Sequence, residues 1–345
     1  MITASPLTRH PENWQQELAQ AITSPAELCR VLGLDPALVP AAAAAATDFR
    51  LRVPRGFVAR MRRGDPNDPL LRQVLPMAAE LQSPADYSAD PLAESAARSV
   101  PGLLHKYRGR ALLVTTGACA VHCRYCFRRE YPYADDQTDS VRWQPAIDAV
   151  AADSSIEELI LSGGDPLSLS DARLRELTDR LTMIPHLRRL RVHTRQPIVL
   201  PERVSAGLLD WLRALRWPTV IVLHANHANE IDGSVIAACE RLRAAGATLL
   251  NQSVLLAGVN DSAAALHALS LALWEAGVLP YYLHALDRVR GASHFAVDEL
   301  QARQLHADLL ATLPGYLVPR LVREIPGAAS KLPLSGDIGA ARALK

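Results

Sequence analysis

The 345-residue sequence has almost no net charge, because 37 lysine and arginine residues nearly balance 36 aspartate and glutamate residues. Nucleic-acid-binding proteins usually have a basic excess, so this balance argues against nucleic acid as a partner. The sequence also lacks any apolar run near the ~18 residues that span a membrane. Residues 1–5 have no apolar signal character. We therefore expect a cytoplasmic protein that binds neither nucleic acid nor membrane.

Cysteine is scarce, and three of the five cysteines lie within eight residues as Cys119, Cys123 and Cys126, spaced C-x3-C-x2-C. Thiols that are this close in a reducing compartment indicate metal or cluster ligands rather than disulfides. A cubic iron–sulfur cluster normally takes four thiolates, so three leave one iron open to a small molecule. This spacing favours a [4Fe-4S] cluster with an open iron.

A structural zinc site is the main alternative for these cysteines, and it would need a fourth ligand. His122 is the nearby candidate. The two remaining cysteines, Cys29 and Cys239, lie far away on helical apolar stripes, and we expect both in the core. A non-catalytic zinc module is therefore a distant second reading of the chain.

From residue 111 onward, six strand-length apolar runs alternate with helical stretches. Buried strands in alternation with helices indicate a parallel sheet with helical crossovers. We predict an α/β fold, a partial (β/α)6 barrel, with its chemistry beyond the carboxyl ends of the strands. The predicted strands are residues 111–116, 158–162, 190–194, 219–224, 248–253 and 279–286.

The region before the barrel is predicted to be helical, with proline-rich breaks. Ser24 to Glu27 form a capping box, and Gly33 ends the helix that it starts. The six arginines of residues 50–63 could dock an acidic partner or be solvated or paired internally. We predict an N-terminal helical region at 1–100, the barrel at 101–315 and a C-terminal segment at 316–345.

Two further motifs follow predicted strands or close the chain. Gly163 and Gly164, within Ser162 to Pro166, allow a close backbone approach to a ligand, and Asp165 can accept a hydrogen bond from an amine. Lys331 lies in a loop of small residues. Such a lysine is normally a solvated charge, but a flexible loop also suits a lysine that bonds to pyridoxal phosphate (PLP).

The cysteine loop with Tyr125 before its third cysteine resembles that of the radical S-adenosylmethionine (SAM) enzymes. Over residues 50–335 the chain resembles the lysine 2,3-aminomutase family, whose members combine a radical SAM barrel with PLP. The segments that carry this resemblance are 106–110, 117–129, 162–165, 194–201, 224–231, 251–256, 280–284 and 323–333. Within this family, the motifs of the chain most resemble those of the bacterial branch that makes β-lysine for elongation factor P.

The resemblance implies a role for each matching residue. Arg128 would bind the substrate carboxylate, and Asp287 and Glu324 would bind the lysine side-chain ammonium. The longer free-lysine enzymes have aspartate where this chain has Glu324. The implied cofactor residues are Cys119, Cys123 and Cys126 for the cluster, Ser162, Gly163, Gly164, Asp165 and Tyr125 for SAM, and Lys331, Lys106, Tyr107, Arg110 and Gln252 for PLP.

The implied reaction is the conversion of L-α-lysine to β-lysine by migration of the amino group to the neighbouring carbon. A cellular one-electron reductant would feed the cluster, and the radical made from SAM would take a hydrogen from the substrate. The implied partners are elongation factor P and its lysyl ligase. A free-lysine or other amino-acid aminomutase in catabolism or osmolyte synthesis is the nearer alternative. The sequence leaves the oligomeric state open.

Overall fold

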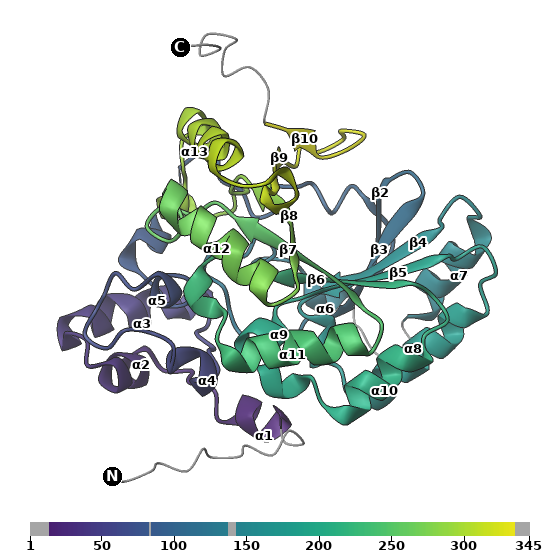
Figure 1. Cartoon of the computed structure of the whole chain (residues 1–345), viewed down its shortest axis with the longest axis horizontal. Helices are drawn as coiled ribbons and strands as arrows, with labels where there is room; N and C mark the ends of the chain where they lie inside the picture. The colour runs from purple at the N-terminus through teal and green to yellow at the C-terminus, as the bar shows by residue number, and fades with distance from the viewer. Residues whose placement is uncertain (1–13, 83, 137–142, 335–345) are drawn as a thin grey trace.

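The computed structural model describes residues 14–82, 84–136 and 143–334, and a single ten-stranded sheet runs through it in chain order (Figure 1). Seven neighbouring strands are parallel: β3 (Arg110–Thr116), β4 (Glu158–Gly163), β5 (Arg189–Thr194), β6 (Thr219–His224), β7 (Thr248–Val254), β8 (Leu279–His284) and β9 (Arg320–Arg323). Antiparallel strands extend both edges: β1 (Arg98–Val100), β2 (Leu103–Tyr107) and β10 (Leu332–Pro333).

The prediction of a partial barrel is confirmed. Each of the six predicted strands is present, and within the described residues the end strands β1 and β10 do not pair with each other, so the barrel stays open. The sequence did not predict β9, which is only four residues long. It also missed the antiparallel additions, so the predicted C-terminal segment is in part a continuation of the barrel sheet.

Helices cover the outer face of the sheet, and Figure 1 shows them along one side of the curved strands. The crossover helices are α7 (Gln144–Ala152), α8 (Asp171–Thr182), α10 (Ala206–Ala214), α11 (Gly233–Ala244), α12 (Ala263–Glu275) and α13 (Glu299–Thr312). Side-chain oxygens of Ser170, Ser205, Asp232, Ser262 and Asp298 cap five of them at the N-terminus. Such caps satisfy backbone N–H groups that the first helical turn leaves free.

The main core lies between these helices and the outward side chains of the strands. Leu159 and Leu161 of β4, with Leu190 and Val192 of β5, belong to this core cluster, as does the buried Cys239. Because side chains alternate along a strand, the residues between them face the opposite, inner side of the barrel. The inner side therefore receives the polar residues Ser162, His193, His224, Gln252 and His284.

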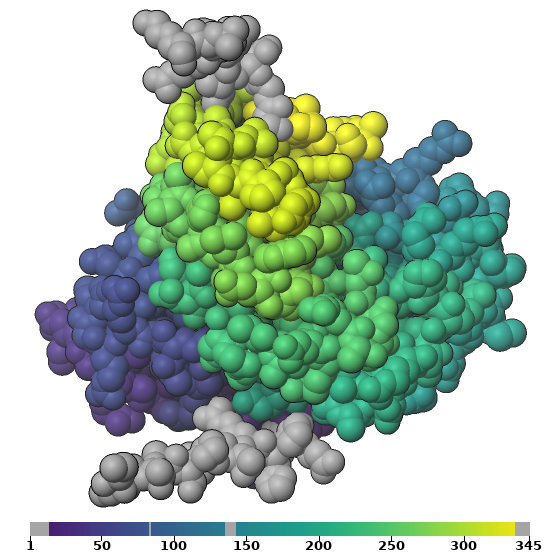
Figure 2. All heavy atoms as spheres, in the orientation of Figure 1, coloured from purple at the N-terminus to yellow at the C-terminus, as the bar shows by residue number. Residues whose placement is uncertain are grey.

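The N-terminal helices form a second core cluster that is shared with the barrel. They are α1 (Trp14–Ala19), α2 (Pro25–Leu32), α3 (Val39–Asp48), α4 (Arg55–Val58) and α5 (Pro69–Arg72). Their buried side chains, with Cys29 among them, pack against Ala120 and Val121 of the cysteine loop and against Val199 and Leu200. In Figure 2 this purple and blue region lies directly against the green barrel.

Short helical turns complete the described elements. Two are α-helical, α6 (Tyr133–Asp136) and α9 (Gln196–Val199). The others are 3-10 turns: η1 (Pro36–Leu38), η2 (Ala78–Leu81), η3 (Pro166–Ser168), η4 (Pro201–Arg203), η5 (Ala228–Glu230), η6 (Ser293–Phe295) and η7 (Gly315–Leu317). Within the described ranges, no helix is long and apolar enough to cross a membrane.

The predicted helix start and end are confirmed, whereas only the Ser24 half of the predicted capping box is present, because the Glu27 side chain pairs with Arg55. The Ser24 hydroxyl accepts the Glu27 backbone N–H at 3.4 Å, and Gly33 ends α2 with φ of 66°. The basic stretch forms internal contacts: Arg55 pairs with Glu27, and Arg60 donates to the Ile198 carbonyl oxygen at 2.6 Å. These contacts support the internally paired alternative for this stretch.

Candidate active site

The cysteine loop follows the carboxyl end of β3 and is attached to the N-terminal region. The Arg124 backbone N–H donates to the Gln73 carbonyl oxygen at 2.9 Å, and His122 N–H donates to that of Arg52 at 2.9 Å. The His122 ring has partners in the N-terminal region, because its Nδ1 is 2.8 Å from the Arg50 carbonyl oxygen and it stacks on Phe49. These contacts do not support His122 as a fourth zinc ligand.

The three thiols of the loop are close together and partly buried, and their joint ionisation requires positive charge beside them. Burial raises the pKa of Cys119 and raises that of Cys126 to about 11, and the charge of Cys123 adds to both effects. Three thiolates cannot be ionised together here without positive charge beside them, and an iron–sulfur cluster supplies it. In the described part of the chain, no three His, Cys, Asp or Glu side chains already form a closed metal-ion site. The thiols therefore fit the cluster by the chemistry of the donor set.

Glycine is required where β4 ends against the cysteine loop. Gly163 has φ of 118°, and a Cβ there would lie 2.7 Å from the Thr116 carbonyl oxygen. A Cβ on Gly164 would lie 2.4 Å from the Ala118 carbonyl oxygen. The backbone N–H of Gly164 instead donates to Thr116 O at 2.6 Å. The two glycines thus let the second strand end in contact with the loop that holds the thiols.

Asp165 connects the ends of β4 and β5. Its carboxylate accepts the Thr194 hydroxyl at 2.7 Å, and it accepts the backbone N–H groups of Leu167, Arg195 and Gln196. Burial raises the pKa of Asp165, although these donors oppose the shift. Four donors occupy this carboxylate within the scaffold, so the predicted contact with the amine of SAM stays a prediction.

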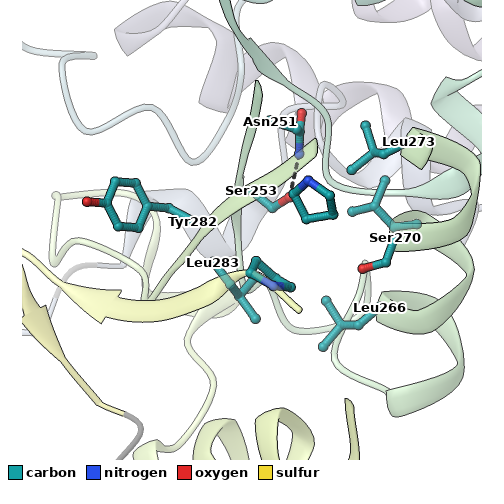
Figure 3. A pocket seen from close by; sticks show the side chains of 10 residues that line it. Asn251, Ser253, Leu266, Ser270, Leu273, Tyr282 and Leu283 are labelled. Carbon is teal, nitrogen blue, oxygen red and sulfur yellow. Dashed lines mark hydrogen bonds between the residues drawn. The ribbon is translucent and has the colours of Figure 1, made fainter. Parts of the chain in front are cut away.

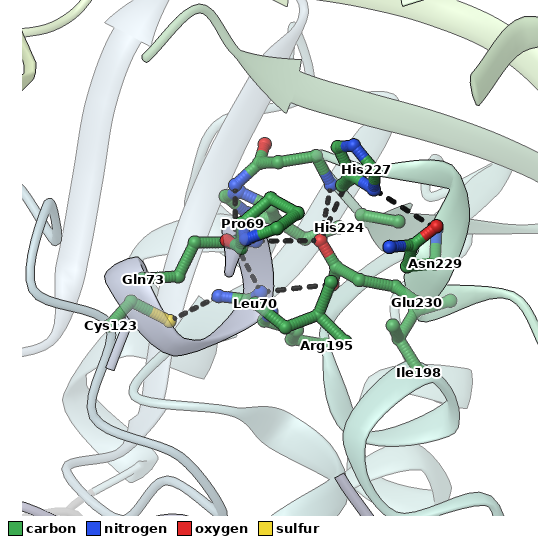
Figure 4. A network of polar contacts seen from close by, with 12 residues as sticks. Pro69, Leu70, Gln73, Cys123, Arg195, Ile198, His224, His227, Asn229 and Glu230 are labelled. Atoms are coloured by element: carbon green, nitrogen blue, oxygen red, sulfur yellow. Dashed lines mark hydrogen bonds and ion pairs between the residues drawn. The ribbon is translucent and has the colours of Figure 1, made fainter. Parts of the chain in front are cut away.

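A buried polar network lies next to Cys123 (Figure 4). Arg195 donates to the Cys123 sulfur at 2.8 Å and pairs with Glu230 at 2.9 Å. The Gln73 side chain, from the N-terminal region, accepts from Arg195 at 2.6 Å. Hydrogen bonds from surrounding residues orient metal ligands and set the potential of iron–sulfur clusters. The N-terminal region therefore reaches the neighbourhood of the thiols through Gln73.

Tyr125 is fully enclosed in this same network. Its hydroxyl accepts the Asn226 amide at 2.7 Å and lies 3.2 Å from Nε2 of His224. Its ring packs edge-on against Phe295. The predicted position of Tyr125 against the adenine of SAM remains a prediction, because the described contacts of its hydroxyl all go to protein groups.

A line of alternating charges leads from the cysteine loop to the C-terminal lysine. Arg128 forms two contacts with Glu94, of 2.7 and 2.8 Å, and Glu94 pairs with Lys106 at 3.1 Å. Lys106 pairs in turn with Glu324 at 2.9 Å, and Glu324 also pairs with Lys331. The five side chains come from five separate segments of the chain. The structure thus brings the predicted residues Arg128, Lys106, Glu324 and Lys331 together.

Asp287 and two histidines adjoin the Lys331 end of this line. Burial and the nearby Glu324 raise the pKa of Asp287 to about 7, against the opposing effect of Lys331. Burial and the Lys331 charge lower the pKa of His284 to about 3, and they also lower that of His193. Both imidazoles are therefore neutral at pH 7 and can serve as hydrogen-bonding groups without adding charge.

The residues predicted for the PLP pocket are divided between the Lys331 end of the charged line and the inner face of the sheet. Burial and the nearby Glu324 charge raise the pKa of Tyr107, and the guanidinium of Arg110 lies 4.6 Å from the Tyr107 ring centroid. Gln252 lies on the inner side of β7, in register with Tyr282. The Lys331 ammonium is 5.9 Å from the Tyr282 ring centroid. A reachable amine beside aromatic rings and neutral imidazoles fits the attachment of a PLP ring.

A small crevice between α12 and the outer side of β7 and β8 is separate from this arrangement (Figure 3). Leu266, Ser270 and Leu273 of α12 line it together with Leu283. Figure 3 shows the Tyr282 ring pointing away from these helix side chains. The crevice is therefore a packing feature of the outer face rather than part of the site.

Polar residues of the site that were not predicted from the sequence include Glu94, His193 and His284, and also Gln73 and Glu230 beside Cys123. His193 and His284 lie on strands at inner-face positions, so the alternation of each strand could have pointed to them. Glu94 lies in no recognisable motif, and only the folded arrangement brings it to Arg128. No local sequence signal could have identified it.

An open barrel with three thiols after its first parallel strand and a glycine turn after its second defines an enzyme of the radical SAM class. A family model described as "4Fe-4S single cluster domain" matches residues 108–186. One solved structure, a radical SAM methyltransferase from Sphaerobacter thermophilus, shares 18% identity with a TM-score of 0.41, covering 64% of this chain and 68% of that chain. That likeness is too distant to support any conclusion.

Curated relatives give the particular family. The L-lysine 2,3-aminomutase of Escherichia coli (strain K12) is 50% identical over 324 residues, covering 94% of each chain. The Haemophilus influenzae protein of that name is 46% identical, over 96% of this chain and 98% of its own. The one from Clostridium subterminale is 34% identical, over 93% of this chain and 77% of its own. The chain belongs to the L-lysine 2,3-aminomutase family and is an isomerase, with a [4Fe-4S] cluster, SAM and PLP as the family's cofactors.

Proposed function

We propose that this chain converts L-α-lysine to β-lysine, using a [4Fe-4S] cluster on Cys119, Cys123 and Cys126 and PLP on Lys331. The observation that supports this best is the charged line between Arg128 and the Glu324 and Asp287 carboxyl groups. Lysine carries a carboxylate at one end and an ammonium at the other. A guanidinium and a carboxyl pair at opposite ends of one site match that distribution of charge.

In this proposal each end of the site performs a separate task. Arg128 binds the substrate carboxylate, and Glu324 with Asp287 binds the side-chain ammonium. When bound, the cluster with SAM supplies hydrogen-atom abstraction, and PLP supplies a conjugated ring that accommodates the migrating amino group. Two fixed ends would determine which carbon faces the abstracting group, because they leave the substrate little freedom to slide.

The resemblance implies aspartate in the longer free-lysine enzymes at the position of Glu324. The surroundings of Glu324 support a role in ammonium binding. Burial would raise the pKa of Glu324, but the Lys331 and Lys106 ammonium groups outweigh burial and lower it to about 2. Glu324 is therefore ionised at any working pH. Its present partner, Lys331, is itself a primary ammonium, the same group that a bound lysine would present.

We further propose that the product serves the modification of elongation factor P through its lysyl ligase. This part of the proposal rests on the resemblance of the sequence motifs to the bacterial branch that makes β-lysine for elongation factor P. Lysine catabolism or osmolyte synthesis is the alternative use of the same reaction. A cellular one-electron reductant is required in either case.

The test is an anaerobic assay of the reconstituted protein with SAM, PLP, dithionite and L-lysine, with β-lysine followed by mass spectrometry. Formation of β-lysine supports the proposed reaction. Cleavage of SAM without β-lysine would retain the radical SAM class and reject lysine as substrate. Addition of elongation factor P and its lysyl ligase then tests the use of the product, because β-lysine should appear on the factor only when this chain is active.

A further inference from the structure

Glu94 is a buried carboxylate between two cations of the site, Arg128 and Lys106. It is 4% exposed, lies before β1 and contacts Arg128 through both carboxylate oxygens. One of these oxygens also pairs with Lys106. Burial would raise the pKa of Glu94, but Arg128 and Lys106 outweigh burial and lower it. Glu94 is therefore a charged group at a position where charge is costly unless it is paired.

The backbone before Glu94 is strained in a way that turns the side chain inward. Ala93 is the single non-glycine residue of the described ranges with positive φ, at 48°. Such a conformation is unfavourable for a residue with a side chain and persists only where the surroundings enforce it. The Asp90 carboxylate enforces the turn, because it accepts the N–H groups of Glu94 at 2.8 Å and Ser95 at 3.0 Å. As a result Leu92 and Glu94 are buried while Ser95 is exposed.

The contacts of Glu94 leave part of the Arg128 guanidinium free for a ligand. A guanidinium has five N–H donors. Glu94 takes one on Nε and one on Nη2, and the Ser162 hydroxyl takes one on Nη1 at 3.1 Å. Five donors less these three leave two, one on each terminal nitrogen. Two donors are the number that a carboxylate accepts from a guanidinium when it pairs through both of its oxygens.

We infer that Glu94 is a positioning residue of the substrate site, which holds Arg128 and Lys106 so that the two free donors of Arg128 meet the substrate carboxylate. The inference rests on the proposed function, in which Arg128 binds that carboxylate. Without Glu94, Arg128 would lose the contacts that fix its plane, and it would stand near Lys106 as an unpaired like charge. The strained turn, the Asp90 contacts and the Lys106 pair all fix Glu94 in place, so the substrate binds beside it without displacing it.

The test compares Glu94→Gln and Glu94→Asp with the wild type in the loaded enzyme. Steady-state β-lysine formation gives kcat and KM, and anaerobic calorimetry gives the equilibrium affinity for L-lysine. For Glu94→Gln we expect KM and the dissociation constant to rise tenfold or more, with kcat changed less than threefold, since a tenfold loss corresponds to about one weakened charge-assisted contact. Glu94→Asp keeps the charge and should recover part of the affinity.

Glu158→Gln is the matched control. Glu158 forms a similar two-point pair with Arg191, at 3.1 and 2.6 Å, but it lies at the opposite end of β4. Iron content and thermal unfolding of all variants check that they fold. Affinity for lysine should be unchanged in Glu158→Gln.

Three outcomes would overturn the inference while the wild type remains active. The first is a lower KM in Glu94→Gln, which would make Glu94 a competitor that the substrate displaces. The second is a loss confined to kcat, and the third is an effect no larger than that of Glu158→Gln. A wild type that binds no lysine and forms no β-lysine would instead reject the proposed function, and the inference with it.

Discussion

Asp287 is the residue whose charge state the substrate would alter most. Its raised pKa, about 7, means that the empty site holds it protonated below that pH and ionised above it. Only the ionised form neutralises an ammonium. In the proposed site, a lysine that binds at acidic pH would have to drive a proton from Asp287, whereas the strongly acidic Glu324 stays ionised throughout.

The resulting pH dependence is the first prediction. KM for lysine should rise as the pH falls below 7, by up to about tenfold per pH unit, because each unit costs about 1.4 kcal/mol of proton release. Asp287→Asn should weaken lysine binding at pH 8 and give a flat profile between pH 6 and 8. The measurement is KM across this range with iron content held constant. A wild-type profile as flat as that of the variant would contradict the assignment.

The second prediction concerns Lys331. Lys331→Ala should abolish covalent PLP binding and β-lysine formation, because no other described residue offers an amine with the same contacts. Lys331→Arg is the matched control for folding, since it keeps a cation beside Glu324 but cannot bond to an aldehyde. Borohydride reduction followed by mass spectrometry measures the attachment. PLP retained covalently in both variants would remove Lys331 from the site.

The third prediction concerns the thiols. Cys126→Ala should lower bound iron and acid-labile sulfide to near zero after reconstitution. Cys239→Ala, also a buried cysteine but one in the barrel core, should keep the full iron content and lose only stability, by about 1 kcal/mol or more. Iron and sulfide analysis of anaerobically purified samples compares the cluster content of the two variants. Equal iron in the two variants would place the cluster elsewhere.

At the scale of single residues, the sequence predicted those residues that a short local pattern identifies. The three cysteines stand out because the spacing of cluster ligands is a short-range pattern. Glu94 could not be predicted, since its partners Arg128 and Lys106 become neighbours only through folding. The contacts of Asp165 and Tyr125 were likewise inaccessible, because several strand ends supply them at once.

At the scale of elements, the turn after β4 determines how the first two strand ends meet. Its two glycines allow backbone contacts that any Cβ would prevent, and these contacts fix the segment from Thr116 to Ala118 against the end of β4. The geometry of the thiols therefore depends on a neighbouring strand as well as on their own loop.

The fourth prediction tests that dependence. Gly164→Ala should destabilise the protein by about 1–3 kcal/mol and reduce iron incorporation, because the new methyl overlaps the Ala118 carbonyl. Gly233→Ala is the control, since a Cβ at the start of α11 meets nothing within 4 Å. Thermal unfolding and iron content report both effects. Normal iron loading in Gly164→Ala would show that the loop adapts independently of β4.

The elements themselves were predictable in proportion to their length. The six long parallel strands were identified from their apolar runs, because a strand that is covered by helices must be apolar over most of its length. The four-residue β9 and the two-residue β10 carry no such pattern. They exist as strands only because an edge is available to each: β9 adds to β8, and β10 adds to β9.

At the scale of the whole molecule, a fully buried ion pair joins the N-terminal region to the barrel. Arg124 of the cysteine loop pairs with Glu80 and is 0% exposed, and Arg129 pairs with the same carboxylate at 3.0 Å. A buried pair stabilises little compared with an apolar contact, but removal of one partner leaves an uncompensated charge. The region and the barrel should therefore unfold as one unit.

The fifth prediction follows from this pair. Glu80→Ala should lower the free energy of unfolding by about 3–5 kcal/mol. Glu157→Ala, which removes an exposed pair with Arg189, should cost less than about 1 kcal/mol. Denaturant unfolding followed by both circular dichroism and tryptophan fluorescence measures the two costs. Separate transitions for the two probes in the wild type would contradict a single cooperative unit.

The strict chain order of the sheet also has a consequence for how the protein is made. Every strand pairs with the strand synthesised just before it, so the barrel can grow one strand at a time as the chain leaves the ribosome. The cysteine loop emerges early, whereas Glu324 and Lys331 emerge about 200 residues later. At ~5–20 residues per second this delay is on the order of ten seconds or more. Iron could thus be loaded on a nascent chain, while the vitamin B6 cofactor must wait until the last described strands are in place.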